Sequence, residues 1–258
     1  MTASLTVRHH GMVAVITGAS RGLGAGMAEG LAGAGFQLGL CARTRPTAPA
    51  RSRALVASVD VADAEALDGF AAEVVARFGR IDLWINNAGL LAPIGPLADA
   101  DPGALKSNIE VNVLGVMHGT ATFVRHLRAR AGEGVLVNVS SGAASRPYVG
   151  WAAYGGAKAA VEMITEVVAR EERASGLRAY ALSPGLIDTD MQALIRATSD
   201  EDFPSAARFR QVHADGTFNS AAWVTRFILD QLVDDARPAV DPHDTDEFVV
   251  RIRVPDQH

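Results

Sequence analysis

The order of apolar segments along the chain constrains its fold more than any other feature of the sequence. Short runs of β-branched residues and leucines stand at 12–17, 36–42, 54–58, 81–85, 134–139 and 177–182, with a weaker run at 247–254. Longer segments with apolar residues at helical spacing lie between them, at 23–34, 64–78, 101–129 and 151–174. Strands that alternate with helices form a parallel sheet covered on both faces. We therefore expect an α/β fold with a doubly wound parallel sheet.

The whole chain, residues 1–258, is expected to form one domain. No Gly/Ser-rich or charged linker divides the sequence, and proline and glycine fall between the predicted elements. Two segments, 44–53 and 191–219, are less regular than the rest. The second is long enough to cover a binding site as a lid, and an irregular surface insertion is the alternative interpretation.

Composition and charge restrict the classes of partner and the compartment. The formal net charge is −5, whereas nucleic-acid binders cluster Lys and Arg and usually carry net positive charge, so we expect no DNA or RNA partner. Apolar runs of about five residues are far shorter than the roughly 20 residues that cross a bilayer. The start of the chain has no signal-peptide pattern. A lone cysteine, Cys41, is expected in the core of a cytoplasmic protein rather than as a nucleophile.

A glycine-rich turn over 17–24 joins the first predicted strand to the first predicted helix. Gly18, Gly22 and Gly24 remove side chains where backbone N–H groups must approach a pyrophosphate, and the helix that follows directs its positive dipole end there. A tight turn without any ligand has the same spacing. The place of this glycine-rich turn in the first βα unit favours a dinucleotide site. The other residues of the turn, Ser20, Arg21 and Leu23, would also contact the dinucleotide.

The end of the second predicted strand indicates which dinucleotide binds. An NAD site usually has an acidic residue there, about 20 residues after the glycines, to bind the ribose hydroxyls. Here Ala42 holds that place and Arg43 follows. An arginine can bind a 2′-phosphate through charge-assisted hydrogen bonds, and Arg21 can reach the same phosphate. We therefore predict NADP(H), although either arginine could instead be a solvated surface side chain.

Three polar residues between 135 and 158 form a candidate acid/base set. Ser141 follows a predicted strand at the sheet edge where open α/β sheets bind ligands, and Tyr154 and Lys158 share one face of a predicted helix. A nearby ammonium lowers the pKa of a phenol from about 10 toward neutrality, so Tyr154 could exchange a proton with a substrate oxygen. Taken alone, a tyrosine on a helix is usually packed in the core, a lysine is usually solvated, and a serine after a strand is often a helix cap. The three together, downstream of a phosphate loop, predict a catalytic site.

The motifs Thr17-Gly-x3-Gly-x-Gly24, Asn86-Asn-Ala-Gly89, Asn112, Ser141, Tyr154-x3-Lys158 and Pro184-Gly185 together resemble the short-chain dehydrogenase/reductase family from about residue 12 to 190. The resemblance implies a Rossmann-type fold of about seven parallel strands. It implies that Tyr154 is the general acid/base, that Lys158 holds the nicotinamide ribose, and that Ser141, with Ser140 as the competing serine, orients the carbonyl. It places Asn112 in a water relay to Lys158. The other implied cofactor contacts are Asp60 and Val61 at the adenine, then Asn87, Ala88, Gly89, Pro184, Gly185, Ile187 and Thr189.

The motifs Asn138-Val-Ser-Ser141, Gly150-Trp151-x2-Tyr154, Ser183-Pro-Gly185 and Asp188-Thr-Asp-Met-Gln192 are most similar to the sepiapterin reductase and benzil reductase branch of that family. This branch implies NADPH-dependent reduction of a ketone, often one member of a vicinal dicarbonyl. The family also implies a homodimer or homotetramer paired through the long helices. An acidic residue anchors the pterin in sepiapterin reductase. Ser220 takes its place in an ungapped comparison, which argues against a pterin substrate.

The substrate is expected to contact mostly apolar walls. Trp151 precedes the predicted catalytic helix, and Met191, Leu194 and Phe203 come from the 191–219 segment, where they could equally pack that segment against the domain. We predict an NADPH-dependent carbonyl reductase for a small apolar or aromatic ketone.

Two alternatives to this function stay open. One is a 3-oxoacyl-carrier-protein reductase, which a basic patch would favour, and the sequence offers only scattered Arg196, Arg208 and Arg210. The other is a non-enzymatic NADP-sensing protein on the same fold. No residues have metal-ligand spacing, and His213 and His243 are expected at the surface.

Overall fold

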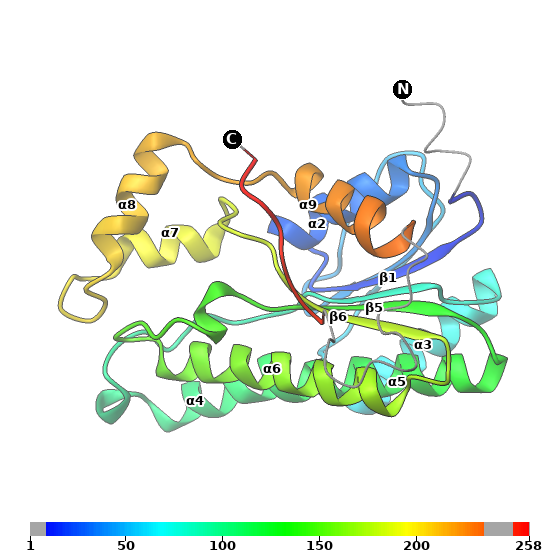
Figure 1. Ribbon diagram of the computed structural model, residues 1–258, viewed down its shortest axis with the longest axis horizontal. Helices are drawn as coiled ribbons and strands as arrows, with labels where there is room; N and C mark the ends of the chain where they lie inside the picture. The colour runs from blue at the N-terminus through cyan, green and yellow to red at the C-terminus, as the bar shows by residue number, and fades with distance from the viewer. Residues whose placement is uncertain (1–8, 235–249, 258) are drawn as a thin grey trace.

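The computed structural model describes residues 9–234 and 250–257, and these contain a seven-stranded parallel sheet (Figure 1). The strands, in chain order, are β1 (Val13–Thr17), β2 (Gln37–Ala42), β3 (Ala54–Ser58), β4 (Leu83–Asn86), β5 (Gly134–Val139), β6 (Leu177–Ser183) and β7 (Arg251–Arg253). They lie side by side in the order β3-β2-β1-β4-β5-β6-β7. The order reverses between β1 and β4, and such a reversal opens a crevice at the carboxyl ends of the strands, where ligands bind. The predicted fold class is confirmed.

Alternating side chains along the strands explain why helices cover both faces of the sheet. Ala14 and Ile16 of β1 pack in one apolar cluster with residues of α2 (Gly22–Gly33) and α9 (Ala221–Phe227). Val13 and Val15 pack in a second cluster with residues of α3 (Ala64–Phe78), α5 (Gly115–Arg130) and α6 (Ala152–Glu171). Because side chains along a strand point to opposite faces in turn, a strand that is apolar throughout must be covered on both sides.

The remaining helices modify two of the sequence-based expectations. The predicted helix at 101–129 is divided into α4 (Pro102–Ile109), a π-helical turn η2 (Glu110–Leu114) and α5. The segment 191–219 is more regular than expected, because it contains α7 (Asp190–Ala197) and α8 (Ala206–Asp215). Figure 1 shows these two helices together at one end of the molecule. Short 3-10 turns stand at η1 (Leu97–Asp99) and η3 (Gly142–Ala144), and a second π-helical turn, η4 (Ile228–Val233), extends α9.

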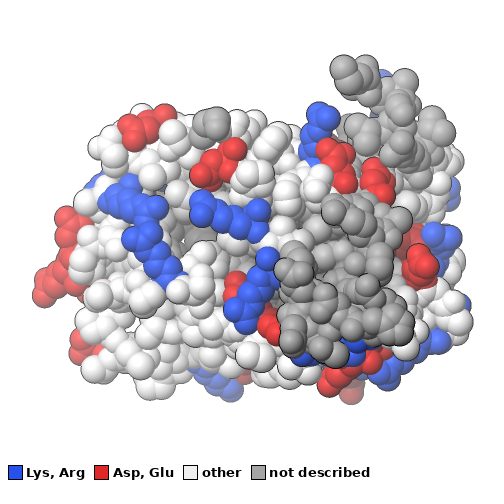
Figure 2. Space-filling model, in the orientation of Figure 1, with Lys and Arg blue, Asp and Glu red and all other residues white. Residues whose placement is uncertain are grey.

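Other expectations agree with the described residues. The first six strands match their predicted ranges to within two residues at either end. The segment 44–53 has neither helix nor strand, as expected. The last strand is shorter than the predicted 247–254, of which 247–249 lie outside the described residues. In the part of the chain that is described, no helix is both long and apolar enough to cross a membrane. Figure 2 shows acidic and basic side chains interspersed on one face.

Candidate active site

A cleft of about 1440 Å³ lies where the carboxyl ends of the strands meet the loops that follow them. Its walls come from the glycine-rich turn after β1 and from the loops after β2, β4, β5 and β6. The cleft brings together the residues predicted for the cofactor, namely Gly18, Ser20, Arg21, Gly22, Leu23, Gly24, Arg43, Asp60, Val61, Asn87, Ala88, Gly89, Pro184, Gly185, Ile187 and Thr189. Ser141, Tyr154 and Lys158 line the same cleft.

The glycine-rich turn packs too closely against the loop after β4 to accept side chains. A Cβ on Gly24 would lie 2.4 Å from the Gly18 carbonyl oxygen, and one on Gly18, whose φ is +66°, would lie 2.7 Å from the Ala88 Cα. Asn87 fastens the two loops together, because its Nδ2 donates hydrogen bonds to the carbonyl oxygens of Thr17 (3.1 Å) and Gly18 (3.2 Å). The turn is therefore held at a fixed place above β1 and β4.

The amino terminus of α2 suits the pyrophosphate of a dinucleotide. Arg21 occupies the N-cap position with extended backbone and makes no side-chain capping bond, and the first turn contains no acidic residue. The first backbone N–H groups of a helix have no partner within it and favour an anion. The residues present at this end of the cleft thus fit a dinucleotide cofactor.

Tyr154 and Ser141 form the polar centre of the cleft. Tyr154 lies in the first turn of α6 and is buried, and Ser141 lines the same cleft, where its Oγ accepts the Ala143 N–H at 3.2 Å. Burial raises the pKa of Tyr154 above its ordinary value of about 10, and the Ser141 side chain partly opposes this shift. Ser140, the competing serine, instead donates to Glu162 Oε1 at 2.9 Å. Both serines line the cleft, and the preference for Ser141 stays a prediction.

Lys158 lies below Tyr154 on α6 and is also buried. Its Nζ donates to the Val139 carbonyl oxygen at 2.7 Å and stands 5.8 Å from the centre of the Tyr154 ring. Burial lowers the pKa of Lys158 to about 8. The expectation that Lys158 lowers the pKa of Tyr154 is wrong for this structure, because burial penalises both the ammonium and the phenolate and dominates each pKa.

Asn112 lies beneath the cleft rather than in its lining. Its side chain is buried in η2, accepts from the Leu90 N–H at 2.9 Å, and donates to the Leu90 carbonyl (2.7 Å) and Asn108 Oδ1 (3.0 Å). These bonds fix the chain that follows Gly89. The role observed is the positioning of a cleft wall; the water relay stays a prediction.

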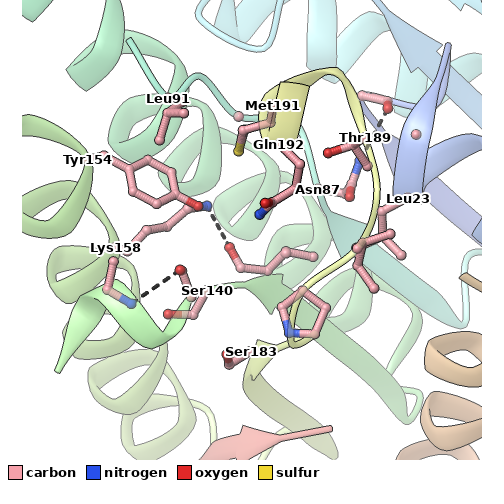
Figure 3. Close-up of a pocket in the computed structure, with 18 of the residues that line it drawn as sticks. Leu23, Asn87, Leu91, Ser140, Tyr154, Lys158, Ser183, Thr189, Met191 and Gln192 are labelled. Carbon is pink, nitrogen blue, oxygen red and sulfur yellow. Dashed lines mark hydrogen bonds between the residues drawn. The ribbon is translucent and has the colours of Figure 1, made fainter. Parts of the chain in front are cut away.

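Aromatic rings form the wall of the cleft next to Tyr154. Trp151, Met191 and Leu194 line the cleft as predicted, together with Tyr148 and Leu91, which the sequence reasoning did not identify. Phe203 does not line it: its fully buried ring stacks on Trp151 with centroids 4.5 Å apart. Phe203 therefore supports the wall from behind, which is the packing role that the sequence left open. Figure 3 shows Leu91, Tyr154 and Met191 around one part of the cavity and Leu23 and Thr189 around another.

The substrate role predicted for Ser220 is not supported. Ser220 is absent from the lining, and its Oγ accepts the Trp223 N–H at 3.1 Å as the N-cap of α9. Its backbone N–H donates to Gln257 Oε1 at 2.8 Å. The position that the ungapped comparison predicted to contact the substrate is therefore a helix cap in the structure.

The lining also includes Gln192, which the sequence analysis used only as the last residue of the motif Asp188-Thr-Asp-Met-Gln192. A single polar residue after Met191 carries no pattern that distinguishes the cleft side of a short helix from the solvent side. Cys41, in contrast, behaves as predicted: it is fully buried, and burial raises the pKa of its thiol to about 12. His213 is exposed, and His243 lies outside the described residues. Within the described ranges, no group of three or more His, Cys, Asp or Glu residues could hold a metal ion.

The chain is similar to known oxidoreductases over most of its length. A sequence model of the family described as short chain dehydrogenase matches residues 12–200. A benzil reductase ((S)-benzoin forming) of Bacillus cereus is 33% identical over 230 residues, which are 84% of this chain and 92% of the relative. The enzyme of the same name from Bacillus subtilis is 30% identical over 225 residues, with the same coverage of 84% and 92%.

A solved structure agrees with these relatives. The crystal structure of the KRED1-Pglu enzyme superimposes with a TM-score of 0.76 at 32% sequence identity, covering 85% of this chain and 93% of that one. The match at 12–200 spans the glycine-rich turn, the serine and the tyrosine-lysine pair described above. The chain therefore belongs to the short chain dehydrogenase family.

Proposed function

We propose that the protein is an NADPH-dependent carbonyl reductase for small apolar or aromatic ketones, with vicinal diketones as the favoured class. The observation that carries the proposal is that Ser141, Tyr154 and Lys158 line one cleft together with the glycine-rich turn, with Tyr154 buried against the aromatic wall. The family acts on CH–OH and C=O groups with nicotinamide cofactors. The name benzil reductase, given to two relatives, supports a diketone.

The site residues would handle the carbonyl oxygen. The reduced nicotinamide, when bound, supplies the hydride that adds to the carbonyl carbon. The Tyr154 hydroxyl donates a proton to the carbonyl oxygen, and Ser141 fixes that oxygen by a hydrogen bond. A phenol with the ordinary pKa of about 10 is already protonated at neutral pH, and burial, which raises the pKa of Tyr154, leaves it in that state. Lys158, with its pKa of about 8, is mostly charged at neutral pH and would bind the ribose hydroxyls.

The preference for NADPH rests on the end of β2. Ala42 is buried there, and the exposed Arg43 lines the cleft. Arg21 also lines the cleft, but its side chain is 79% exposed and its Nη1 stands 3.1 Å from the Asp190 carboxylate. The ion pair reduces the charge that Arg21 offers to a phosphate. Arg43 is therefore the main candidate for a contact with the 2′-phosphate.

An assay of NADPH consumption with a panel of carbonyl compounds tests the proposal. The panel contains benzil, deoxybenzoin, sepiapterin and an acetoacetyl thioester. We expect turnover to be fastest with benzil. In Tyr154→Phe, kcat should fall at least about 100-fold, as is typical when a general acid is lost, while the Kd of NADPH stays unchanged. Tight NADPH binding without turnover of any carbonyl would support the sensor alternative instead.

The carrier-protein alternative finds less support at the cleft. Arg196 pairs with Asp188 at 3.2 Å, and Arg210 pairs with Asp200. Of the three arginines considered, Arg208 lines the cleft and the other two do not. On the face seen in Figure 2, acidic side chains stand beside some of the basic ones. Faster turnover of the acetoacetyl thioester than of benzil would nevertheless favour this function.

A further inference from the structure

Gln192 is a buried polar side chain to which the mechanism above gives no role. It lies on α7, is 8% exposed and lines the cleft. Its Oε1 is buried and has no hydrogen-bond partner among the described residues. An unpartnered buried amide oxygen destabilises a fold, and nearly all buried polar groups in native proteins have a partner. The Nε2 group of the same carboxamide is not buried in this way, so it is the atom that Gln192 offers to a ligand in the cleft.

The position of Gln192 in the cleft indicates what it can reach. Figure 3 shows its side chain extending into the cavity between Tyr154 and Thr189. The first turn of α7 holds its backbone, since the Ala193 N–H donates to the Thr189 carbonyl oxygen at 3.0 Å. Ile195 anchors the same helix, because it is buried in the apolar cluster that also contains Trp151 and Tyr154. The carboxamide is thus presented from a packed helix next to the proposed proton donor.

We propose that Gln192 determines substrate specificity by binding a second oxygen of the substrate, adjacent to the carbonyl that Tyr154 protonates. This inference rests on the proposed function. A carboxamide carries two N–H donors and one carbonyl acceptor. Its Nε2 can donate to the second carbonyl oxygen of a vicinal diketone. A ketone with one oxygen leaves the carboxamide without a partner.

The test compares two ketones of nearly the same shape in the wild type and in Gln192→Met. Benzil has two adjacent carbonyls, and deoxybenzoin replaces one of them by a methylene group. Methionine resembles glutamine in shape but has no N–H donor and only a weak acceptor. We expect kcat/KM for benzil to fall about 3- to 10-fold, the range of one neutral hydrogen bond, mainly through KM. For deoxybenzoin the change should stay within about twofold. Gln192→Glu, an acceptor without donors, should lose benzil activity in the same way.

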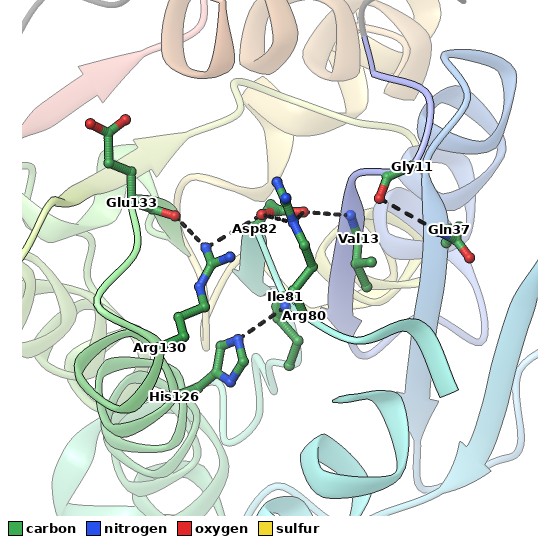
Figure 4. Close-up of polar contacts among 9 residues, drawn as sticks. All are labelled: Gly11, Val13, Gln37, Arg80, Ile81, Asp82, His126, Arg130 and Glu133. Atoms are coloured by element: carbon green, nitrogen blue, oxygen red, sulfur yellow. Dashed lines mark hydrogen bonds and ion pairs between the residues drawn. The ribbon is translucent and has the colours of Figure 1, made fainter. Parts of the chain in front are cut away.

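Gln37→Met is the matched control. Gln37, on β2, also has a buried Oε1 without a partner among the described residues, and its Nε2 donates to the Gly11 carbonyl oxygen at 3.5 Å, away from the cleft (Figure 4). This variant should leave kcat/KM for both ketones unchanged. Gln192→Met should keep the wild-type Kd for NADPH, and its Tm should not be lower than that of the wild type, because an unpartnered buried amide is removed.

The possible outcomes separate this inference from the proposed function. Equal losses on benzil and deoxybenzoin in Gln192→Met would overturn the assignment, because the residue would then shape the site without recognising a second oxygen. A weaker Kd for NADPH would overturn it too and would place Gln192 at the cofactor. If wild-type protein binds NADPH but reduces neither ketone, the proposed function fails and the assignment fails with it, and no variant is needed to see this.

Discussion

Replacing Asp82 by alanine removes a carboxylate that joins the starts of β1 and β4 to the end of α5 (Figure 4). Asp82 is 4% exposed, and its Oδ2 accepts the Val13 N–H at 2.9 Å. Arg80 Nε donates to both carboxylate oxygens, at 2.7 and 2.8 Å, and Arg130 Nη2 donates to Oδ1 at 3.3 Å. All of these contacts lie at the amino-terminal edge of the sheet, opposite the cleft.

The expected loss in the free energy of unfolding follows from how deeply each partner of Asp82 is buried. Leaving the Val13 N–H without its acceptor costs about 1–3 kcal/mol, since this bond is buried. Removing one member of a buried ion pair costs about 3–5 kcal/mol, but the Arg80 side chain is 52% exposed and solvent compensates much of its loss. The Arg130 side chain is only 22% exposed, so solvent compensates less of the loss of its contact with Asp82. Together we expect Asp82→Ala to lower the free energy of unfolding by about 3 kcal/mol.

Urea unfolding followed by circular dichroism measures this loss through the midpoint and the m-value. In a chain of this length, 3 kcal/mol corresponds to a fall in Tm of about 6–12 °C. Arg80→Ala is the control, and it should cost no more than about 1 kcal/mol because the guanidinium is half exposed. At a temperature where Asp82→Ala is folded, kcat per folded molecule should equal that of the wild type. A loss below about 1 kcal/mol in Asp82→Ala would refute the reasoning, since it would mean that the Val13 N–H and Arg130 find other partners without cost.

Three further outcomes are expected. Arg43→Ala should weaken NADPH binding by about one to two decades and leave NADH nearly unchanged, in line with the loss of a charge-assisted hydrogen bond; titration of both cofactors checks this, and equal or tighter binding of NADH by the wild type contradicts it. Burial lowers the pKa of Lys158 to about 8, so its ammonium is lost as the pH rises through that value. We therefore expect kcat/KM for reduction to fall above about pH 8, and a profile that stays flat to pH 10 would show that the charge is not needed. The side chains of Met163 and Val167 on α6 are 56% and 44% exposed, so we expect this face to bury itself in a homodimer or homotetramer; a light-scattering mass near 27.0 kDa at micromolar concentration would contradict this.

The strands could be predicted from the sequence because burial on both faces leaves a local signature. A run such as 134–139 is mostly apolar and short, all six of its residues are buried, and β5 begins and ends at the predicted positions. The π-helical turn at Glu110–Leu114 left no such signature. One extra residue in a turn rotates the apolar stripe by about 100° around the helix, which is about the width of the stripe. The residues before and after the π-helical turn can then be taken for one broad apolar face. The segment 101–129 therefore predicted one continuous helix.

The helices of 191–219 were missed for a related reason. In α8, Ala206 and Phe209 are the buried residues of a ten-residue helix whose other side chains are mostly polar. Two buried positions are too few to distinguish a helical period from a chance spacing of apolar residues in one sequence. These helices are stable because they pack against each other and against the aromatic wall, and such tertiary contacts are not visible in a short stretch of sequence.

The candidate site was predictable where its geometry is local and not where it depends on burial. Tyr154 and Lys158 lie one helical turn apart, so their shared face follows from their spacing. The electrostatic argument from the same spacing failed, because it treated the ammonium as the dominant influence on the phenol. In the folded chain both groups are almost completely buried, and desolvation is the largest cause of each pKa shift. Burial keeps Tyr154 in the phenol form, which can donate a proton, and by raising the pKa it also makes that phenol a weaker acid. The spacing of Tyr154 and Lys158 therefore predicted which groups share a helix face, whereas their ionisation depends on burial, which spacing alone does not indicate.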